Sequence, residues 1–265
     1  MSLATIHTIL EQAQAMETVR TICFEGGEPF LYYATLLQGV REAAALGFQV
    51  GIVTNTFWAI SEEDALAALR PMAGLVQTLT LSSDLFHFSE MMSRQAQNAQ
   101  KAASQLGITT SLISVARPET IQAQPSVGEI PPGESGVMYR GRAALKLAGQ
   151  VRQHPWEQFN RCPYENLAGP GRVHLDPFGF VHICQGICIG NFFESPLKEI
   201  ANQYDPAAHP ITSALLAGGP AELAKRYHLS PSASYADACH LCYEMRTRLR
   251  SQFPQILGPQ AMYFG

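Results

Sequence analysis

Short apolar runs alternate with amphipathic stretches through the first half of the sequence. Runs rich in β-branched and large apolar residues, which are typical of strands, recur about every thirty positions. They cover residues 21–24, 50–53, 76–81 and 111–115. Between these runs, apolar side chains return at helical spacing. Strands that alternate with helices predict parallel βα units, which form either an open sheet or part of a barrel.

The expected helices have recognisable ends. Ser61 followed by a run of acidic residues is typical of an N-cap with favourable charges in the first turn. Gly47 and Gly107 stand where helices commonly end. The sequence begins in a predicted helix with Ile6 and Leu10 on one face, and no strand precedes it. In a parallel α/β fold such a helix should return from an earlier strand, so we expect the first strand of the fold to be missing.

The pattern changes in the second half. Proline and glycine without periodicity predict a long loop over residues 117–136. Residues 173–183 form two alternating stretches around an Asp-Pro-Phe-Gly turn, which predicts a β-hairpin. We therefore expect an α/β protein of two domains, with the βα repeats in residues 1–157 and a small α+β domain in residues 158–265.

Composition narrows the class of protein. Hydrophobic residues make up 46% of the chain and charged residues 15%, which supplies a core and argues against disorder. A net charge of −4 without a basic run gives no electrostatic footprint for nucleic acid. No apolar run reaches the ~18 residues that span a bilayer, and no signal-peptide pattern opens the chain. We expect a soluble cytoplasmic protein without membrane or nucleic-acid partners.

The sharpest local motif is Glu25-Gly26-Gly27-Glu28-Pro29, at the end of the first expected strand. The glycines allow the backbone to approach a ligand closely, and carboxylates at the carboxyl edge of a sheet can hold an ammonium group. The alternative is a tight turn between strand and helix with exposed acids.

Polar residues also follow the next two expected strands. Thr54 and Asn55 come after the second, and Ser82 opens a Ser-Ser-Asp run after the third, with His87 beyond it. Arg94, on the following helix, could bind a carboxylate at the same edge. Each residue alone is more typical of a helix cap or a solvated face. Together they favour a site for a polar small molecule.

The cysteines form a second group. Five of the six lie beyond residue 160, and in a cytoplasmic protein they would be thiols rather than disulfides. They are Cys162, Cys184, Cys188, Cys239 and Cys242. The Cys-x-x-Cys at the end of this set and a cysteine at the end of the hairpin suit sulfur coordination of zinc or of an iron–sulfur cluster.

These landmarks resemble, in order and spacing, those of the radical S-adenosylmethionine (radical SAM) enzymes. The resemblance covers nearly the whole chain and implies a partial (βα)6 barrel that lacks its first strand. It implies that Gly26, Gly27, Glu28 and Pro29 bind the methionyl ammonium of S-adenosylmethionine. By the same resemblance Asn55, Ser82 and Arg94 belong to the cofactor site, with Ser82 and Arg94 at the cofactor carboxylate.

One feature of that family is absent from the sequence. The family holds its catalytic 4Fe-4S cluster on a Cys-x-x-x-Cys-x-x-Cys loop after the first strand, and these 265 residues contain no such triplet. Cys23, the first cysteine, lies inside an expected strand and is interpreted as a small core residue. Either the chain is a fragment of a longer enzyme or the catalytic cluster has been lost. We favour the fragment, and expect no turnover by this chain alone.

The second half resembles the SPASM or twitch extension that follows many radical SAM barrels. The similarity lies in Cys162, a hairpin glycine (Gly179) shortly before Cys184, and the later cysteines. It implies an auxiliary 4Fe-4S cluster, which we assign to four cysteines and from which we leave Cys188 as an alternate ligand or spare thiol. The assigned ligands are Cys162, Cys184, Cys239 and Cys242.

The resemblance also implies an activity for the complete protein. Reduction of S-adenosylmethionine would release a 5′-deoxyadenosyl radical that modifies a peptide or protein substrate, with electrons from an external donor such as flavodoxin or ferredoxin. The competing hypothesis is a non-enzymatic binding module in which the cysteines hold a structural zinc ion. No catalytic acid or base is assigned.

Overall fold

The structure of the chain is a computed structural model that describes residues 1–82, 90–116, 133–136 and 138–263. It divides into two compact units, and the described part of the first ends at Gly136. We expected the boundary near residue 157. The division falls earlier because the backbone N–H of Tyr139 donates to Asp237 at 3.4 Å and Ala144 lies in the core of the second unit.

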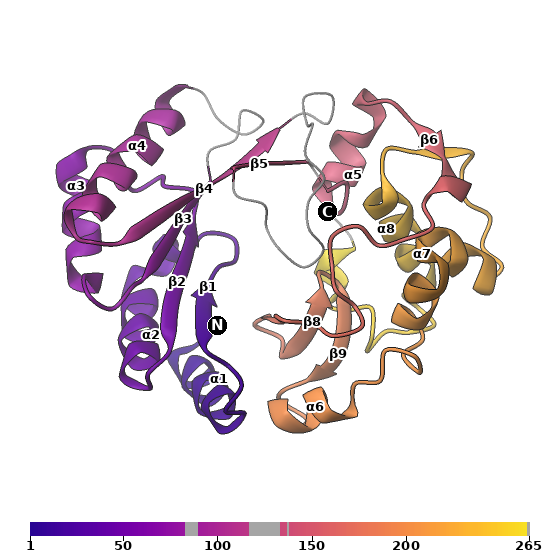
Figure 1. The fold of residues 1–265 in the computed structure, drawn as a ribbon, viewed down its shortest axis with the longest axis horizontal. Coiled ribbons are helices and arrows are strands. Elements are labelled where there is room, and N and C mark those ends of the chain that lie inside the picture. Colours follow the sequence, from indigo (N-terminus) through magenta and orange to yellow (C-terminus); the bar gives the residue numbers. More distant parts are fainter. Residues whose placement is uncertain (83–89, 117–132, 137, 264–265) are drawn as a thin grey trace. The chain divides into compact units, whose positions relative to one another are not determined.

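Unit 1 is a parallel sheet with helices between its strands (Figure 1). Among the described residues, five strands pair in the order β1-β2-β3-β4-β5, each parallel to the next. The strands are β1 (Thr21–Phe24), β2 (Gln49–Thr54), β3 (Thr78–Ser82), β4 (Thr109–Ala116) and β5 (Gly133–Gly136). The helices are α1 (Leu3–Ala15), η1 (Pro29–Tyr32), α2 (Tyr33–Ala45), α3 (Glu62–Leu69), η2 (Arg70–Met72) and α4 (Glu90–Gln105). The expected α/β class with a parallel sheet is confirmed.

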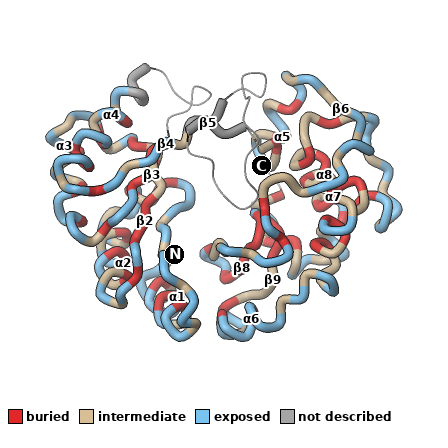
Figure 2. The backbone as a smooth tube through the Cα atoms, in the orientation of Figure 1, coloured by how far each residue is buried: buried red, intermediate tan, exposed pale blue. Residues whose placement is uncertain are grey.

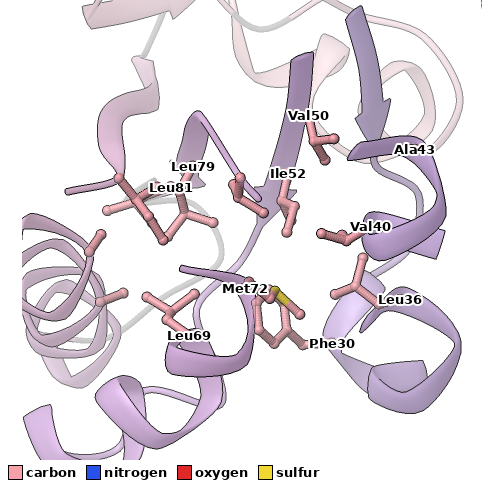
Figure 3. Close-up of a cluster of buried hydrophobic side chains, with 14 of the residues drawn as sticks. Phe30, Leu36, Val40, Ala43, Val50, Ile52, Leu69, Met72, Leu79 and Leu81 are labelled. Atoms are coloured by element: carbon pink, nitrogen blue, oxygen red, sulfur yellow. The ribbon is translucent and has the colours of Figure 1, made fainter. Parts of the chain in front are cut away.

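The core of unit 1 lies between the sheet and its helices. Figure 3 shows Val50 and Ile52 of β2 facing Leu36 and Val40 of α2. Side chains from α1, α2, α3 and α4 all join this one apolar cluster. Each fully buried Val, Leu or Ile in it contributes about 1.5–3 kcal/mol relative to exposure. Because a strand alternates its faces, Leu79 on β3 enters the core while its neighbours do not.

Local signals for the helix ends are confirmed. The side chain of Ser61 accepts a hydrogen bond from the N–H of Asp64, as an N-cap does. Gly47 and Gly107 follow α2 and α4 with φ of +87° and +71°, a conformation that glycine adopts without strain.

Two expectations for unit 1 are wrong. Residues 133–136 were expected within a long loop but form β5, which pairs with β4 from Ile113 to Ala116. This pairing is set by the neighbouring strand, and no local pattern announces it. Cys23 was expected in the core but is exposed, because Ile22 and Phe24 occupy the positions of β1 that pack against the core.

Unit 2 combines small antiparallel sheets with helices (Figure 1). Its strands are β6 (His154–Pro155), β7 (His174–Leu175), β8 (Phe180–Cys184), β9 (Ile187–Asn191) and β10 (Ser234–Tyr235). Its helices are α5 (Arg142–Lys146), η4 (Ala148–Gln150), η5 (Trp156–Gln158), α6 (Leu197–Gln203), α7 (Thr212–Arg226), α8 (Ala238–Leu249) and η6 (Gln260–Met262). Strands β7, β8 and β9 form one sheet, and β6 pairs with β10. Figure 2 shows β8 as a largely buried strand.

The expected hairpin is confirmed as β7 and β8. Asp176 caps its turn by accepting hydrogen bonds from the N–H groups of Phe178 and Phe180. Gly179 has φ of +90°, and a Cβ there would lie 2.2 Å from the Oδ1 atom of Asn191, so only glycine fits.

In the described part of the chain, no helix is long and apolar enough to cross a membrane.

Candidate functional site

The first candidate site is at the carboxyl edge of the parallel sheet, around Glu28. This residue is 7% exposed, and its Oε1 atom accepts hydrogen bonds from the N–H of Phe30 (3.0 Å) and the hydroxyl of Thr54 (2.9 Å). Its Oε2 atom accepts from the N–H of Asn55 at 2.6 Å. The carboxylate thus caps η1 and ties the segment after β1 to the end of β2.

Aromatic packing holds the same edge. The indole N–H of Trp58 donates to the hydroxyl oxygen of Thr54 at 2.9 Å, and its ring stacks on Phe30 with centroids 4.1 Å apart. Thr56 is buried with φ of +64°, an unusual conformation for a β-branched residue. The loop after β2 is therefore fixed by its contacts rather than by local preference.

The two glycines before Glu28 have different constraints. Gly26 has φ of +136°, which strongly favours glycine, whereas Gly27 lies outside the left-handed region. A Cβ added to either residue would meet no atom within 4 Å. At Gly27, neither the backbone conformation nor the packing of the described residues excludes a side chain. The space next to its Cα atom is therefore open to a ligand.

The remaining expected residues of this edge are less closely joined. Ser82 ends β3, where it pairs with Ile113, and Arg94 is an exposed residue of α4. The structure thus brings Glu28 and Asn55 into direct contact, and within the described residues no hydrogen bond or ion pair joins Arg94 to them. Asp84 and His87 lie outside the described residues.

The second candidate site is a cavity in unit 2 whose walls include four of the five clustered cysteines. They are Cys162, Cys184, Cys239 and Cys242. Cys162 and Cys184 are close enough to Cys239 and Cys242 to contribute, after burial, to the raised pKa of both of these thiols. These are the four cysteines that the sequence assigned to one cluster, although their service as ligands stays a prediction.

Three different elements position these cysteines. Cys184 ends β8, while Cys239 and Cys242 lie in the first turns of α8, which Asp237 caps by accepting from the N–H of His240 at 2.7 Å. A helix N-terminus favours negative charge, so a thiolate is stabilised there.

A kink in α7 positions the segment of Cys162. Gly218 and Gly219 have non-helical backbone angles, and Pro220 follows them. A Cβ on Gly219 would lie 2.2 Å from the backbone nitrogen of Arg161, and the N–H of Ala221 donates to the carbonyl of Phe159 at 3.1 Å. The kink therefore makes room for the chain that leads into Cys162.

Arg140 brings a guanidinium group to this cavity. Its Nη1 atom donates to the sulfur of Cys184 at 3.3 Å and lies 4.0 Å from Oε1 of Glu165. The same carboxylate is shared with Arg172, whose Nη2 atom lies 3.5 Å from Oε2. Glu165 therefore offsets only part of the positive charge around it.

Arg246 supplies a second guanidinium and is only 2% exposed. It donates to the carbonyls of Gln185 (2.8 Å) and Cys242 (3.3 Å), and its charge lies 5.6 Å from the ring centre of Tyr263. Within the described ranges, no carboxylate forms an ion pair with it. Burying a cation without an anionic partner costs free energy. A negatively charged group bound in the cavity would therefore be stabilised.

Three of the cavity thiols resist ionisation. Burial raises the pKa of Cys162 and Cys239, and burial raises that of Cys242 to about 12 although Arg246 opposes the shift. Neutral thiols beside the guanidinium groups of Arg140 and Arg246 leave part of the positive charge uncompensated. Metal binding would deprotonate the sulfurs and supply the missing anion.

Cys188 has a different environment and does not line the cavity. Its sulfur lies 3.3 Å from Nδ1 of His182 and 3.3 Å from the carbonyl of Gly258. The N–H of Gly186 donates to Nδ1 of His182, so the ring proton is on Nε2, which donates to Asp176 at 3.0 Å. Burial raises the pKa of Cys188 to about 12, so this thiol is a neutral donor within a buried polar network.

The spacing of the side chains bears on the type of metal. Among the residues that the structure describes, no three His, Cys, Asp or Glu side chains are placed to hold one metal ion. The donor set of the cavity is nevertheless four sulfurs, which suits zinc or an iron–sulfur cluster by its chemistry.

Sequence reasoning did not find the two arginines of the cavity. Arg246 follows Cys242 by four residues, which places both on the same face of α8, so helical spacing could have indicated it. Arg140 lies 44 residues before Cys184, and no local pattern links them.

In comparisons with known proteins, the sequence matches no family model, and no curated protein matches it. Function is therefore inferred from the two residue clusters described above.

Proposed function

We propose that this chain is a radical SAM-type iron–sulfur protein. In this proposal unit 2 is a SPASM/twitch-like domain that binds one auxiliary 4Fe-4S cluster through Cys162, Cys184, Cys239 and Cys242. Unit 1 is part of a (βα)6 barrel that binds S-adenosylmethionine at its carboxyl edge.

One observation carries the proposal: four cysteines from three different segments of the chain line a single cavity together with Arg140 and Arg246. Two cations beside thiols that burial keeps neutral leave the cavity with an excess of positive charge. Four thiolates around a metal cluster would restore the balance, because such a cluster is anionic as a whole.

The spacing of the cysteines favours a cluster over zinc. Zinc–sulfur bonds of about 2.3 Å bring tetrahedral sulfur ligands to within about 3.8 Å of one another. In the described part of the chain no three side chains meet the requirement for one ion. In a 4Fe-4S cluster each thiolate binds a different iron, so the sulfurs stand farther apart around a common space.

The order of the strands in unit 1 supports the barrel. An open doubly wound sheet reverses its strand order and carries helices on both faces. The described strands of unit 1 follow chain order without reversal, and the helices share one core cluster. This arrangement is typical of consecutive βα units of a barrel.

Residues at the carboxyl edge of unit 1 would have different roles in binding S-adenosylmethionine. The backbone at Gly26 and Gly27 would lie against the cofactor, because among the described residues no atom lies within 4 Å of the position of a Cβ at either glycine. Glu28 would position that backbone, since its oxygens already accept three hydrogen bonds within the protein. Asn55, Ser82 and Arg94 complete the proposed cofactor site.

The complete protein would act on a peptide or protein substrate with an external donor such as flavodoxin or ferredoxin. When bound beside a catalytic cluster, S-adenosylmethionine supplies a 5′-deoxyadenosyl radical that abstracts a hydrogen atom. Since these 265 residues contain no Cys-x-x-x-Cys-x-x-Cys, the chain by itself should form no 5′-deoxyadenosine with dithionite. Appreciable 5′-deoxyadenosine under strictly anaerobic conditions would contradict that assignment.

Iron analysis tests the cysteine site. After anaerobic reconstitution with iron and sulfide, we expect about four of each per chain. Cys184→Ser and Cys239→Ser should lose bound iron, whereas Cys23→Ser, which changes an exposed thiol, should retain it. Stoichiometric zinc in the anaerobically purified protein, with no iron uptake on reconstitution, would contradict the cluster and support the structural zinc site.

Equilibrium dialysis with labelled S-adenosylmethionine tests the sheet edge. Gly27→Ala should weaken binding at least about tenfold, about 1.4 kcal/mol, because its methyl group enters the space left for the ligand. Gly149→Ala is the matched control, since a Cβ there also meets nothing within 4 Å. Equal binding by Gly27→Ala and wild type, or no binding by wild type, would refute the site.

A further inference from the structure

Two arginine side chains bring positive charge to the cysteine cavity. Arg246 is 2% exposed, and the side chain of Arg140 is 19% exposed. Among the described residues, Glu165 forms an ion pair with Arg140 and also contacts Arg172, and the carboxyl group of Asp237 is close enough to interact electrostatically with Arg140. No described carboxylate forms an ion pair with Arg246, so these acids offset the two positive charges beside the sulfurs only in part.

Arg140 acts on one sulfur in particular. Its Nη1 atom donates to the sulfur of Cys184 at 3.3 Å, within hydrogen-bond range for sulfur. Arg246 lies one helical turn beyond Cys242 and is fixed by its bonds to Gln185 and to Cys242. Both cations are held in place by the fold, so their charges do not relax away from the cavity.

We propose that Arg140 and Arg246 are positioning residues that serve as counter-charges of the cluster and raise its reduction potential. This inference rests on the proposed function, because it requires that the four cysteines hold an anionic cluster. Reduction adds one electron to a group that is already negative. A fixed cation nearby stabilises the reduced form more than the oxidised form, and the low dielectric of a buried site strengthens the effect.

The two arginines that share Glu165 provide a matched comparison. Arg140 lines the cavity and contacts a sulfur, whereas Arg172 pairs with the same carboxylate, is 37% exposed in its side chain and does not line the cavity. Arg140→Met and Arg172→Met each remove one positive charge from the same ion-pair group. Only the first removes it from beside the sulfurs.

The test is an anaerobic redox titration of the reconstituted full chain, followed by visible absorption and by the electron paramagnetic resonance signal of the reduced cluster. We expect Arg140→Met to lower the midpoint potential by about 59 mV, a tenfold change in the one-electron equilibrium. Arg172→Met should shift the potential by much less. Arg140→Lys, which keeps the charge, should recover most of the wild-type potential.

Each outcome decides the proposal. A potential that is the same in Arg140→Met, Arg172→Met and wild type overturns it, while the iron content of wild type still supports the cluster. Failure of wild type to bind iron refutes the proposed function instead. If Arg140→Met does not fold, Arg140→Gln keeps a hydrogen-bond donor without the charge and should show the same negative shift. An unchanged potential in Arg140→Gln would then overturn the role of the charge.

Discussion

The carboxylate of Glu28 binds the hydroxyl of Thr54 at 2.9 Å, across 26 residues of sequence. Glu28 follows β1 and Thr54 ends β2, so the contact joins the carboxyl ends of two adjacent parallel strands. It makes the Gly-Gly-Glu-Pro segment a rigid edge, which the sequence could indicate only as a candidate binding turn.

Replacing this carboxylate should destabilise unit 1. Glu28→Gln substitutes an amide that cannot accept all three hydrogen bonds, so we expect the free energy of unfolding to fall by about 1.5–3 kcal/mol. The measurement is urea unfolding followed by Trp58 fluorescence in a Trp156→Phe background, which isolates unit 1. Glu63→Gln, at an exposed position of α3, should change stability by less than about 0.5 kcal/mol. Equal effects of the two substitutions would contradict the assigned role of Glu28.

The kink of α7 should determine the position of Cys162 in the cysteine cavity. Gly219→Ala would force a Cβ to within 2.2 Å of the backbone of Arg161 at a φ of +63°. We expect a loss of more than about 2 kcal/mol in the unfolding free energy of unit 2, together with reduced iron uptake. Gly149→Ala, at an open position, should retain both properties. Normal stability and iron content in Gly219→Ala would show that the kink does not position Cys162.

Cys188 should be dispensable for metal binding although it stands four residues from Cys184. Its sulfur is engaged with His182 and Gly258, away from the cavity. We expect Cys188→Ser to keep the wild-type iron content, while Cys184→Ser loses it. Iron loss in a folded Cys188→Ser protein, judged by circular dichroism, would make Cys188 a ligand.

Unit 2 should lose stability on mild acidification through His209. Burial lowers the pKa of this ring, whose Nδ1 accepts from the N–H of Thr212 while Nε2 binds the carbonyl of Cys188. The neutral form is favoured in the folded state, so the unfolded state binds more protons once the pH is below about 6.5. The contribution is complete above that pH and is lost as the pH falls from there toward the lowered folded pKa.

Urea unfolding at about pH 7.5 and about pH 5.5, followed by Trp156 fluorescence in a Trp58→Phe background, measures this dependence. His209→Gln keeps a donor and an acceptor but does not titrate. The stability difference between the two pH values should therefore be smaller in this variant than in its parent. The same difference in both proteins would rule out His209 as the source.

Local patterns predicted much of the fold. β-Branched runs gave β1 to β4, the acids after Ser61 marked the start of α3, and the Asp-Pro-Phe-Gly turn gave the hairpin. These features depend on residues within one or two turns of each other, and backbone sterics act over that range. β5 escaped prediction because its strand conformation depends on pairing with β4.

The candidate sites divide in the same way. The sequence by itself determined the candidate site residues: a Gly-Gly-Glu-Pro edge and five clustered cysteines with a Cys-x-x-Cys. Only the tertiary structure showed that the four cysteines assigned to one cluster share a cavity, that Cys188 turns to His182, and that Arg140 and Arg246 line the same cavity. The reason is that burial and charge compensation depend on contacts between distant segments, such as the 61 residues between Gln185 and Arg246. A linear pattern indicates candidate ligands, and only the packed chain determines the charges that surround them.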